Sequence, residues 1–298
     1  SLSSTGVTFP DGTVQSTAVY GSYRNRIING NMRIAQREVN FISPATNTYT
    51  LDRWVYSNTT AATVSISRYI ELPAELTEGV LYSPATPELN TSLLVEVTGA
   101  DTAISTTDYA NIAQRIEGYN IADLIGKTFT VSFHVRTNIV GPFCVSLRNE
   151  TGDVSYILGY TTPTQNAFNS KWGHYTFVVE GGLPATSTWN TLTGVGLRVE
   201  FTLACGSTYY VGQPEQWYTS TAALALSNQS NLFATVGNKF EVTGVQVEKN
   251  VVLLPQYDLR ADSIELALCQ RYYCVTGASI RGYAGAANQS FASTVSFP

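Results

Sequence analysis

The sequence predicts an all-β protein built as an antiparallel β-sandwich or jelly roll. Short runs that alternate between apolar and polar residues recur along most of the 298 residues, which is the pattern of strands with one buried face. Turn-forming residues separate about ten such runs, and a helical period is almost absent. Charged residues are only 13% of the chain, and polar uncharged residues take their place, as is typical of exposed β proteins.

The most regular alternation runs from Phe129 to Arg136, directly after a turn at residues 124–127. Its apolar positions are Phe129, Val131, Phe133 and Val135, and its polar positions are Thr130, Ser132, His134 and Arg136. A period of two over this length predicts a long strand in the middle of a sheet, with the apolar set on the core.

Other runs of the same kind lie on both sides of this strand. We expect strands at Tyr49–Tyr56, Ala62–Tyr69, Leu93–Val97, Ile112–Ile116, Phe143–Leu147, Tyr156–Leu158, Trp172–Val179, Leu197–Leu203 and Phe240–Val247. In the first of these, the adjacent Asp52 and Arg53 should point to opposite faces of the strand, and Trp54 should lie in the core.

The chain begins with a predicted hairpin at residues 1–22. Val7 and Phe9 suggest a short strand, and a Pro-Asp-Gly turn at residues 10–12 would return the chain through Val14. A hairpin this short cannot bury its apolar face alone, so we expect it to pack on a neighbouring chain or on a shaft. Residues 25–37 follow, with a turn at Asn29-Gly30 or Gly30-Asn31 between short strands.

One stretch departs from the β pattern. Apolar residues at Asp262–Tyr273 fall near helical spacing, and Asp262 with Glu265 three residues later matches a capping box, so we predict a short helix. Residues 277–298 return to β character and resemble the start of another module, which suggests a fragment of a longer chain. We therefore expect three parts: a β segment at 1–37, the sandwich at 38–260, and the helix with a new β module at 261–298.

Composition narrows the possible partners. The net charge of −5 argues against nucleic acid, and without a run of about 18 apolar residues no membrane insertion is expected. Cys144 and Cys205 lie in apolar strand-like runs, and Cys269 and Cys274 lack a zinc spacing. We expect Cys144 and Cys205 to be buried free thiols, all four cysteines to be kept reduced by cytoplasmic assembly, and no metal or cofactor.

No catalytic motif is present, and His134 and His174 are better explained as structural residues. Glycoside hydrolysis needs only two carboxylates placed in space, and the 22 acidic residues leave it open. Long repeats of the kind found in depolymerising spikes are missing, so we expect that the chain is not an enzyme.

Five short runs in one order resemble bacteriophage tail fibre proteins, in their distal region with a carbohydrate-binding-module-like β-sandwich. They are residues 9–18 (FPDGTVQSTA), 25–37 (NRIINGNMRIAQR), 49–54 (YTLDRW), 243–250 (TGVQVEKN) and 264–273 (IELALCQRYY). The resemblance implies a homotrimeric virion fibre, assembled in the host cytoplasm, that recognises the host surface. It also implies contacts with other virion tail proteins, with residues 1–37 providing attachment or trimer contact.

Aromatic residues are the best candidates for binding a host-surface glycan, because sugar rings stack on Trp and Tyr faces. The candidates in loop-like stretches are Trp189, Tyr209, Tyr210, Trp217 and Tyr218. Packing at loop bases is the alternative role for each of them, and Trp172 is open to either.

Two other functions compete with polysaccharide binding. The sandwich is either an architectural spacer, with the receptor site beyond Pro298, or an adaptor that attaches the fibre or its tip to another virion protein. A spacer should bury its loop aromatics, a glycan-binding domain should line one groove with at least two exposed aromatic faces, and an adaptor should bury a large patch against a different chain.

Overall fold

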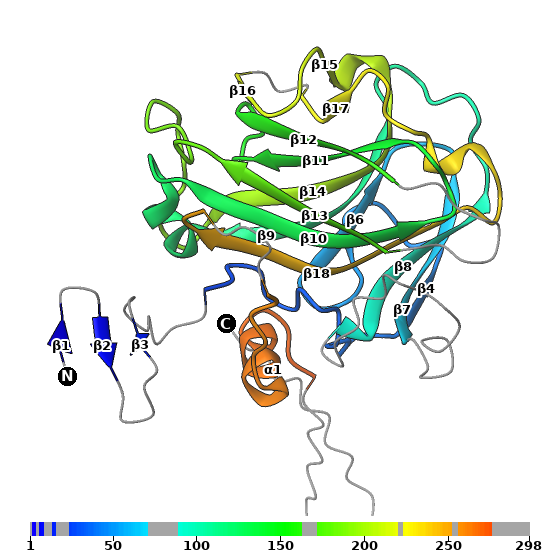
Figure 1. Ribbon diagram of the computed structural model, residues 1–298. Coiled ribbons are helices and arrows are strands. Elements are labelled where there is room, and N and C mark those ends of the chain that lie inside the picture. Colours follow the sequence, from blue (N-terminus) through cyan, green and yellow to red (C-terminus); the bar gives the residue numbers. More distant parts are fainter. Residues whose placement is uncertain are drawn as a thin grey trace, which may run out of the picture.

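The computed structural model describes residues 24–70, 89–162, 172–219, 223–251 and 256–275, and three short strands before them. The protein is a two-sheet antiparallel sandwich, as predicted (Figure 1). In spatial order, the six-stranded sheet contains β13 (Gly173–Val179), β10 (Phe129–Thr137), β18 (Lys239–Lys249), β8 (Thr91–Gly99), β7 (Thr63–Ile70) and β4 (Asn40–Ile42).

The second sheet packs its apolar face against the first. In spatial order, its seven strands are β16 (Trp217–Tyr218), β12 (Ser155–Thr161), β11 (Pro142–Arg148), β14 (Val195–Cys205), β9 (Tyr109–Glu117), β6 (Trp54–Asn58) and β5 (Thr48–Tyr49). The smaller elements are the parallel pair β15 (Tyr210–Val211) and β17 (Ala225–Leu226), the 3-10 helices η3 (Gly118–Asn120), η4 (Ala122–Leu124), η5 (Ser207–Tyr209) and η6 (Leu232–Ala234), and α1 (Asp262–Gln270). In the described part of the chain, no helix is both long and apolar enough to cross a membrane.

Strand β10 confirms the prediction for the central run. It lies between β13 and β18, and its four apolar side chains, at Phe129, Val131, Phe133 and Val135, are completely buried. The predicted polar face is only partly correct, because Thr130 and Ser132 are buried too. The chain beyond β18 lies on this face: Thr130 donates to the Asn250 carbonyl over 2.8 Å. Gln246 of β18, which pairs with Ser132, bonds to Gln256 and Asp258.

Strand β18 has two partners on one side. Its first residues pair with β8, and beyond Gly244 it bonds instead to the segment that precedes the sandwich. There the Arg26 amide donates to the Val247 carbonyl over 2.9 Å, and the Val245 amide donates to the Gly30 carbonyl over 3.0 Å. Gly244 has φ +61°, and a Cβ there would lie 2.7 Å from His134 Nδ1, so glycine is required at the change of partner.

The segment at residues 25–37 forms the predicted turn but not the predicted short strands. The Met32 amide donates to the Asn29 carbonyl over 3.2 Å, which places the turn at Gly30-Asn31. Ile27 and Met32 are both completely buried in the sandwich core.

The predicted strand at Tyr49–Tyr56 is wrong, because the chain reverses within it. Residues 50–53 form a turn between β5 and β6, and Tyr49 pairs with Val55. Arg53 takes a left-handed φ of +73°, a conformation that alternation in the sequence does not reveal. Trp54 lies in the core, as predicted.

Helix α1 is present but ends at Gln270 rather than Tyr273, and the predicted capping box is wrong. The residue at the N-cap is Ala261, and it makes no side-chain capping bond. Asp262 instead pairs with Arg33 over 2.9 Å, and Glu265 turns inward to Arg260 over 3.1 Å. An unpaired buried guanidinium costs more free energy than a solvated helix end without a capping side chain, so Glu265 pairs with Arg260.

The N-terminal residues form the predicted hairpin. Strands β2 (Gly6–Thr8) and β3 (Val14–Gln15) pair as an antiparallel hairpin, and β1 (Leu2–Ser3) adds a third strand. The predicted turn at residues 10–12 and the β module at 277–298 lie outside the described residues. The division of the chain into three parts stays a prediction.

The cysteines are free thiols, as expected. Cys144, Cys205 and Cys269 are buried, and burial raises the pKa of Cys144 to about 11 and that of Cys205 to about 12. Cys274 is exposed, four residues after the end of α1.

His134 and His174 form a cross-strand pair on the outer face of β10 and β13. Their rings stack with centroids 4.2 Å apart and planes 6° apart. Burial, and then the neighbouring His174, lower the pKa of His134 to about 3, against about 6.5 in an unfolded chain. The folded protein therefore resists protonation at His134, and its stability falls as the pH drops from 6.5 toward 3.

We expect His134→Gln to reduce acid sensitivity. Between pH 7.5 and pH 5 the wild type should lose about 2 kcal/mol more unfolding free energy than the variant. Urea unfolding at the two pH values measures this, and His174→Gln, at the exposed member of the pair, is the control with the smaller effect. Equal losses in wild type and His134→Gln would contradict the assignment.

Candidate functional site: a groove at the sandwich edge

A groove opens where the two sheets end on the same side of the sandwich. β13 is the edge strand of one sheet, and β16, paired to β12, is the edge of the other (Figure 1). The groove between them has a volume of about 620 Å³. We call it the edge groove; its lining residues are Tyr156, Thr176, Phe177, Val178, Glu180, Glu215, Gln216 and Trp217.

Trp217 provides the largest flat surface of the edge groove. It is half-buried in β16 and packs on Tyr156 of β12, with ring centroids 5.0 Å apart, and on Trp189, at 5.6 Å. The Trp217 indole N–H is buried and has no hydrogen-bond partner in the described part of the protein. The ring is therefore held by packing alone, with part of its surface free for contact.

Glu215 enters the groove from the turn before β16. Its φ is +56°, a left-handed conformation that costs about 1–2 kcal/mol for a residue with a Cβ. The Glu215 amide donates to the Ile157 carbonyl over 2.7 Å, which fixes the turn against β12. Strained non-glycine residues occur often at binding sites, so this conformation supports a functional role for the turn.

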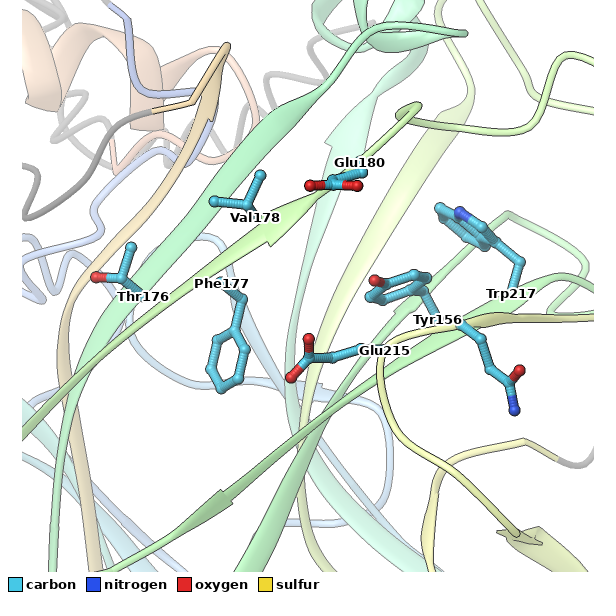
Figure 2. A pocket seen from close by; sticks show the side chains of 8 residues that line it. Tyr156, Thr176, Phe177, Val178, Glu180, Glu215 and Trp217 are labelled. Atoms are coloured by element: carbon cyan, nitrogen blue, oxygen red, sulfur yellow. The ribbon is translucent and has the colours of Figure 1, made fainter.

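Glu180 reaches the groove from the opposite side, just after β13 ends. In Figure 2 its carboxylate, that of Glu215 and the Tyr156 hydroxyl face the same space. Burial first, and then the charges of Glu215 and Glu180, raise the pKa of Tyr156, so its phenol stays protonated and can donate a hydrogen bond.

This set of groups suits a ligand with hydroxyls on a ring. Carboxylates accept hydrogen bonds from hydroxyls, a protonated phenol donates and accepts, and an indole face covers C–H groups. Within the described residues, no three His, Cys, Asp or Glu side chains gather as they would around a metal ion.

The structure divides the five aromatic residues predicted from the sequence into two groups. Only Trp217 lines the edge groove. Trp189 lies behind it, 8% exposed, and its indole donates to the Pro184 carbonyl over 3.0 Å. Trp189 therefore supports the Trp217 ring and does not itself face the groove.

Tyr209, Tyr210 and Tyr218 lie elsewhere, on the outer face of the seven-stranded sheet. They pack on a small cluster that includes Cys144 and Ile157. Each hydroxyl donates to a backbone carbonyl, over 2.9 Å, 3.1 Å and 2.7 Å in that order. Tyr218 is separated from Trp217 because neighbours on a strand point to opposite faces. Glycan binding by these residues stays a prediction.

Sequence reasoning missed Tyr156, Phe177, Glu180 and Glu215. Tyr156 and Phe177 looked like ordinary strand residues, and nothing in the sequence shows that their strands end side by side. An acid directly after a strand, as at Glu180, and an acid just before an aromatic pair, as at Glu215, were the available signals.

The chain is similar to known proteins in structure but not in sequence. No protein-family model and no curated protein sequence matches the chain. The enzymatically active domain of tailspike protein 4 of bacteriophage CBA120 is similar over 76% of this chain and 22% of that one, with 14% identity and a TM-score of 0.36.

Two further solved structures are carbohydrate-binding modules. A family 4 module is similar over 74% of this chain and 98% of its own, with 14% identity and a TM-score of 0.38. The family 11 module of a Clostridium thermocellum cellulosomal cellulase is similar over 72% and 98%, with 10% identity and a TM-score of 0.33.

Proposed function

We propose that this chain is a non-enzymatic segment of a virion tail fibre that binds host-surface polysaccharide in the edge groove. The observation that carries the proposal is the groove itself, in which the free surface of Trp217 stands beside Tyr156 and two carboxylates. The five sequence runs that resemble tail fibre proteins supply the biological setting.

The groove chemistry favours a sugar without acidic groups. Glu180 and Glu215 both line it, and they would repel a carboxylate or phosphate placed between them. They would accept hydrogen bonds from neutral sugar hydroxyls, which agrees with the many uncharged polar residues of the chain.

Trimerisation belongs to the same proposal and comes from the fibre resemblance. A single open groove of this kind would bind weakly, and three copies on one fibre would raise the avidity through effective concentration. Residues 1–37 remain our proposed contact, with the β1–β3 sheet at their start.

The test is adsorption of the purified protein to host cells and to polysaccharide extracted from them. Trp217→Ala removes the stacking surface, and we expect adsorption at least about fivefold weaker, since ring stacking contributes about 1–3 kcal/mol. Glu215→Gln should weaken adsorption less, because the amide oxygen still accepts hydrogen bonds. Mass photometry and circular dichroism verify that the assembly and fold persist.

Matched controls separate the groove from the rest of the surface. Tyr119→Ala removes an exposed aromatic residue outside the groove and should leave adsorption unchanged. Unchanged adsorption of Trp217→Ala would remove the edge groove as the site. Release of reducing ends from the polysaccharide, lost in Glu215→Gln, would show that the chain is an enzyme after all.

The spacer function is the second candidate, and one observation favours it. Of the five loop aromatics, Trp189 is buried and the three tyrosines have their hydroxyls bonded to the backbone. Wild-type protein that binds no glycan but holds a following receptor-binding domain in place would support a spacer. Co-purification with another virion protein would support an adaptor.

A further inference from the structure

Arginines form a row across the outer face of the seven-stranded sheet, away from the edge groove. Arg148 of β11 pairs directly with Arg198 of β14, and Arg198 pairs directly with Arg115 of β9. Arg53, just before β6, extends the row and donates from Nη2 to the Arg115 carbonyl. Like charges placed opposite each other destabilise a sheet, so this arginine row has a cost that calls for a compensating role.

Acidic residues neutralise one end of the arginine row more than the other. Glu200 lies between Arg148 and Arg198, with oxygen–nitrogen distances of 3.3 Å and 3.2 Å. Glu117 lies near the other end, but it pairs with Arg271 over 2.7 Å. In the described part of the chain, the Arg115 guanidinium has no hydrogen bond or ion pair, and Arg53 has no ion pair, with its Nη2 bonded to a backbone carbonyl.

A pocket of about 180 Å³ opens at this end of the row. Its lining residues are Tyr49, Arg53, Arg115, Ile116, Glu117, Thr193, Gly194, Val195 and Tyr272. The volume far exceeds the roughly 30 Å³ that one water occupies in the liquid. The pocket is thus large enough for a small polyatomic group.

One buried donor in this pocket has no partner. Arg53 is only 7% exposed, and its Nε has no hydrogen-bond acceptor among the described residues. The Tyr272 ring covers the Arg53 guanidinium at 3.4 Å and holds it in place without neutralising it. Buried donors of this kind are normally satisfied, so an acceptor is expected here.

We propose that the pocket at Arg53 and Arg115 binds an anionic group, a carboxylate or a phosphate, carried by a ligand. Two adjacent guanidinium groups match the paired oxygens of either group. Arg115 supplies the accessible charge, and Arg53 is a fixed donor beneath it. This site differs from the edge groove in its elements and in its charge, and it does not depend on glycan binding there.

The experiment titrates the full chain at low salt, by calorimetry, with three probes: inorganic phosphate, glucuronate and its neutral methyl ester. We expect phosphate or glucuronate to bind and the ester to fail. Arg115→Gln should weaken anion binding at least about tenfold, since charge-assisted bonds are the strong ones. Because Arg115 is half-exposed and without a partner in the described residues, the fold should survive, as circular dichroism would verify.

The results distinguish the two possible ligands and test whether the anion binds at Arg115. Binding of glucuronate alone points to an acidic sugar, and binding of phosphate alone to a phosphorylated polymer. Lys239→Gln removes a positive charge on the other sheet and should change nothing, and Trp217→Ala should bind the anion as the wild type does. No binding of either anion, or equal binding by Arg115→Gln, overturns the proposal.

Discussion

Replacing Phe133 by alanine is expected to lower the free energy of unfolding by about 3–5 kcal/mol. Phe133 is completely buried at the middle of β10. Four aromatic rings surround it, with centroids 5.1 to 6.1 Å away: Tyr160, Tyr175, Phe177 and Phe201. These rings come from both sheets, so the cavity would weaken the contact between the layers.

Urea unfolding followed by intrinsic fluorescence measures this loss. Tyr119→Ala is the control, because that ring is 59% exposed and its removal should change stability by no more than about 0.5 kcal/mol. A loss below about 1 kcal/mol for Phe133→Ala would mean that the two layers do not meet at this ring.

Removing the carboxylate of Glu265 is expected to cost a similar amount, about 3–5 kcal/mol, because it leaves a buried charge without its partner. Arg260 and Glu265 have side-chain exposures of 4% and 6%. Glu265 also accepts from the Asn29 amide, and Arg260 donates to the Ile27 carbonyl over 2.9 Å. One ion pair therefore joins α1 to the segment before the sandwich.

Asp262→Ala is the matched control for Glu265→Ala. Asp262 lies on the same helix and also pairs with an arginine, but its side chain is 57% exposed, so its loss should cost about 1 kcal/mol or less. Thermal unfolding of both variants gives the comparison. Replacing both Arg260 and Glu265 by apolar residues should restore part of the stability, since no charge is then left unpaired. Equal small losses for the two single variants would contradict a buried role for the pair.

The strands could be predicted because alternation depends on neighbouring residues alone. Val131 and Phe133 are buried as their pattern requires, and the sandwich follows from many such runs. Thr130 and Ser132 are buried although they are polar, because residues beyond β18 lie on their face of the strand. A sequence pattern shows which face of a strand is apolar, but it does not show which distant segment lies over the other face.

The site was less predictable than the fold, for a related reason. The sequence indicates Trp217 as a candidate, but Tyr156 and Glu180 join it only because β12 begins and β13 ends at the same groove. Arg53 was assigned to a strand, whereas its left-handed turn brings it beside Arg115. Both sites depend on the order of strands across a sheet, and periodicity does not give that order.

Strand β18 has a consequence for how the protein is made. It lies between β10 and β8 in the six-stranded sheet, yet it is the last strand of that sheet to be synthesised. The 150 residues between Gly99 and Lys249 take roughly 8–30 s to translate at about 5–20 residues per second. Until β18 is made, β8 has an open edge, as does β10 once it has been synthesised, and such edges promote aggregation. The nascent chain therefore completes this sheet late, and a chain truncated before β18 could not close it.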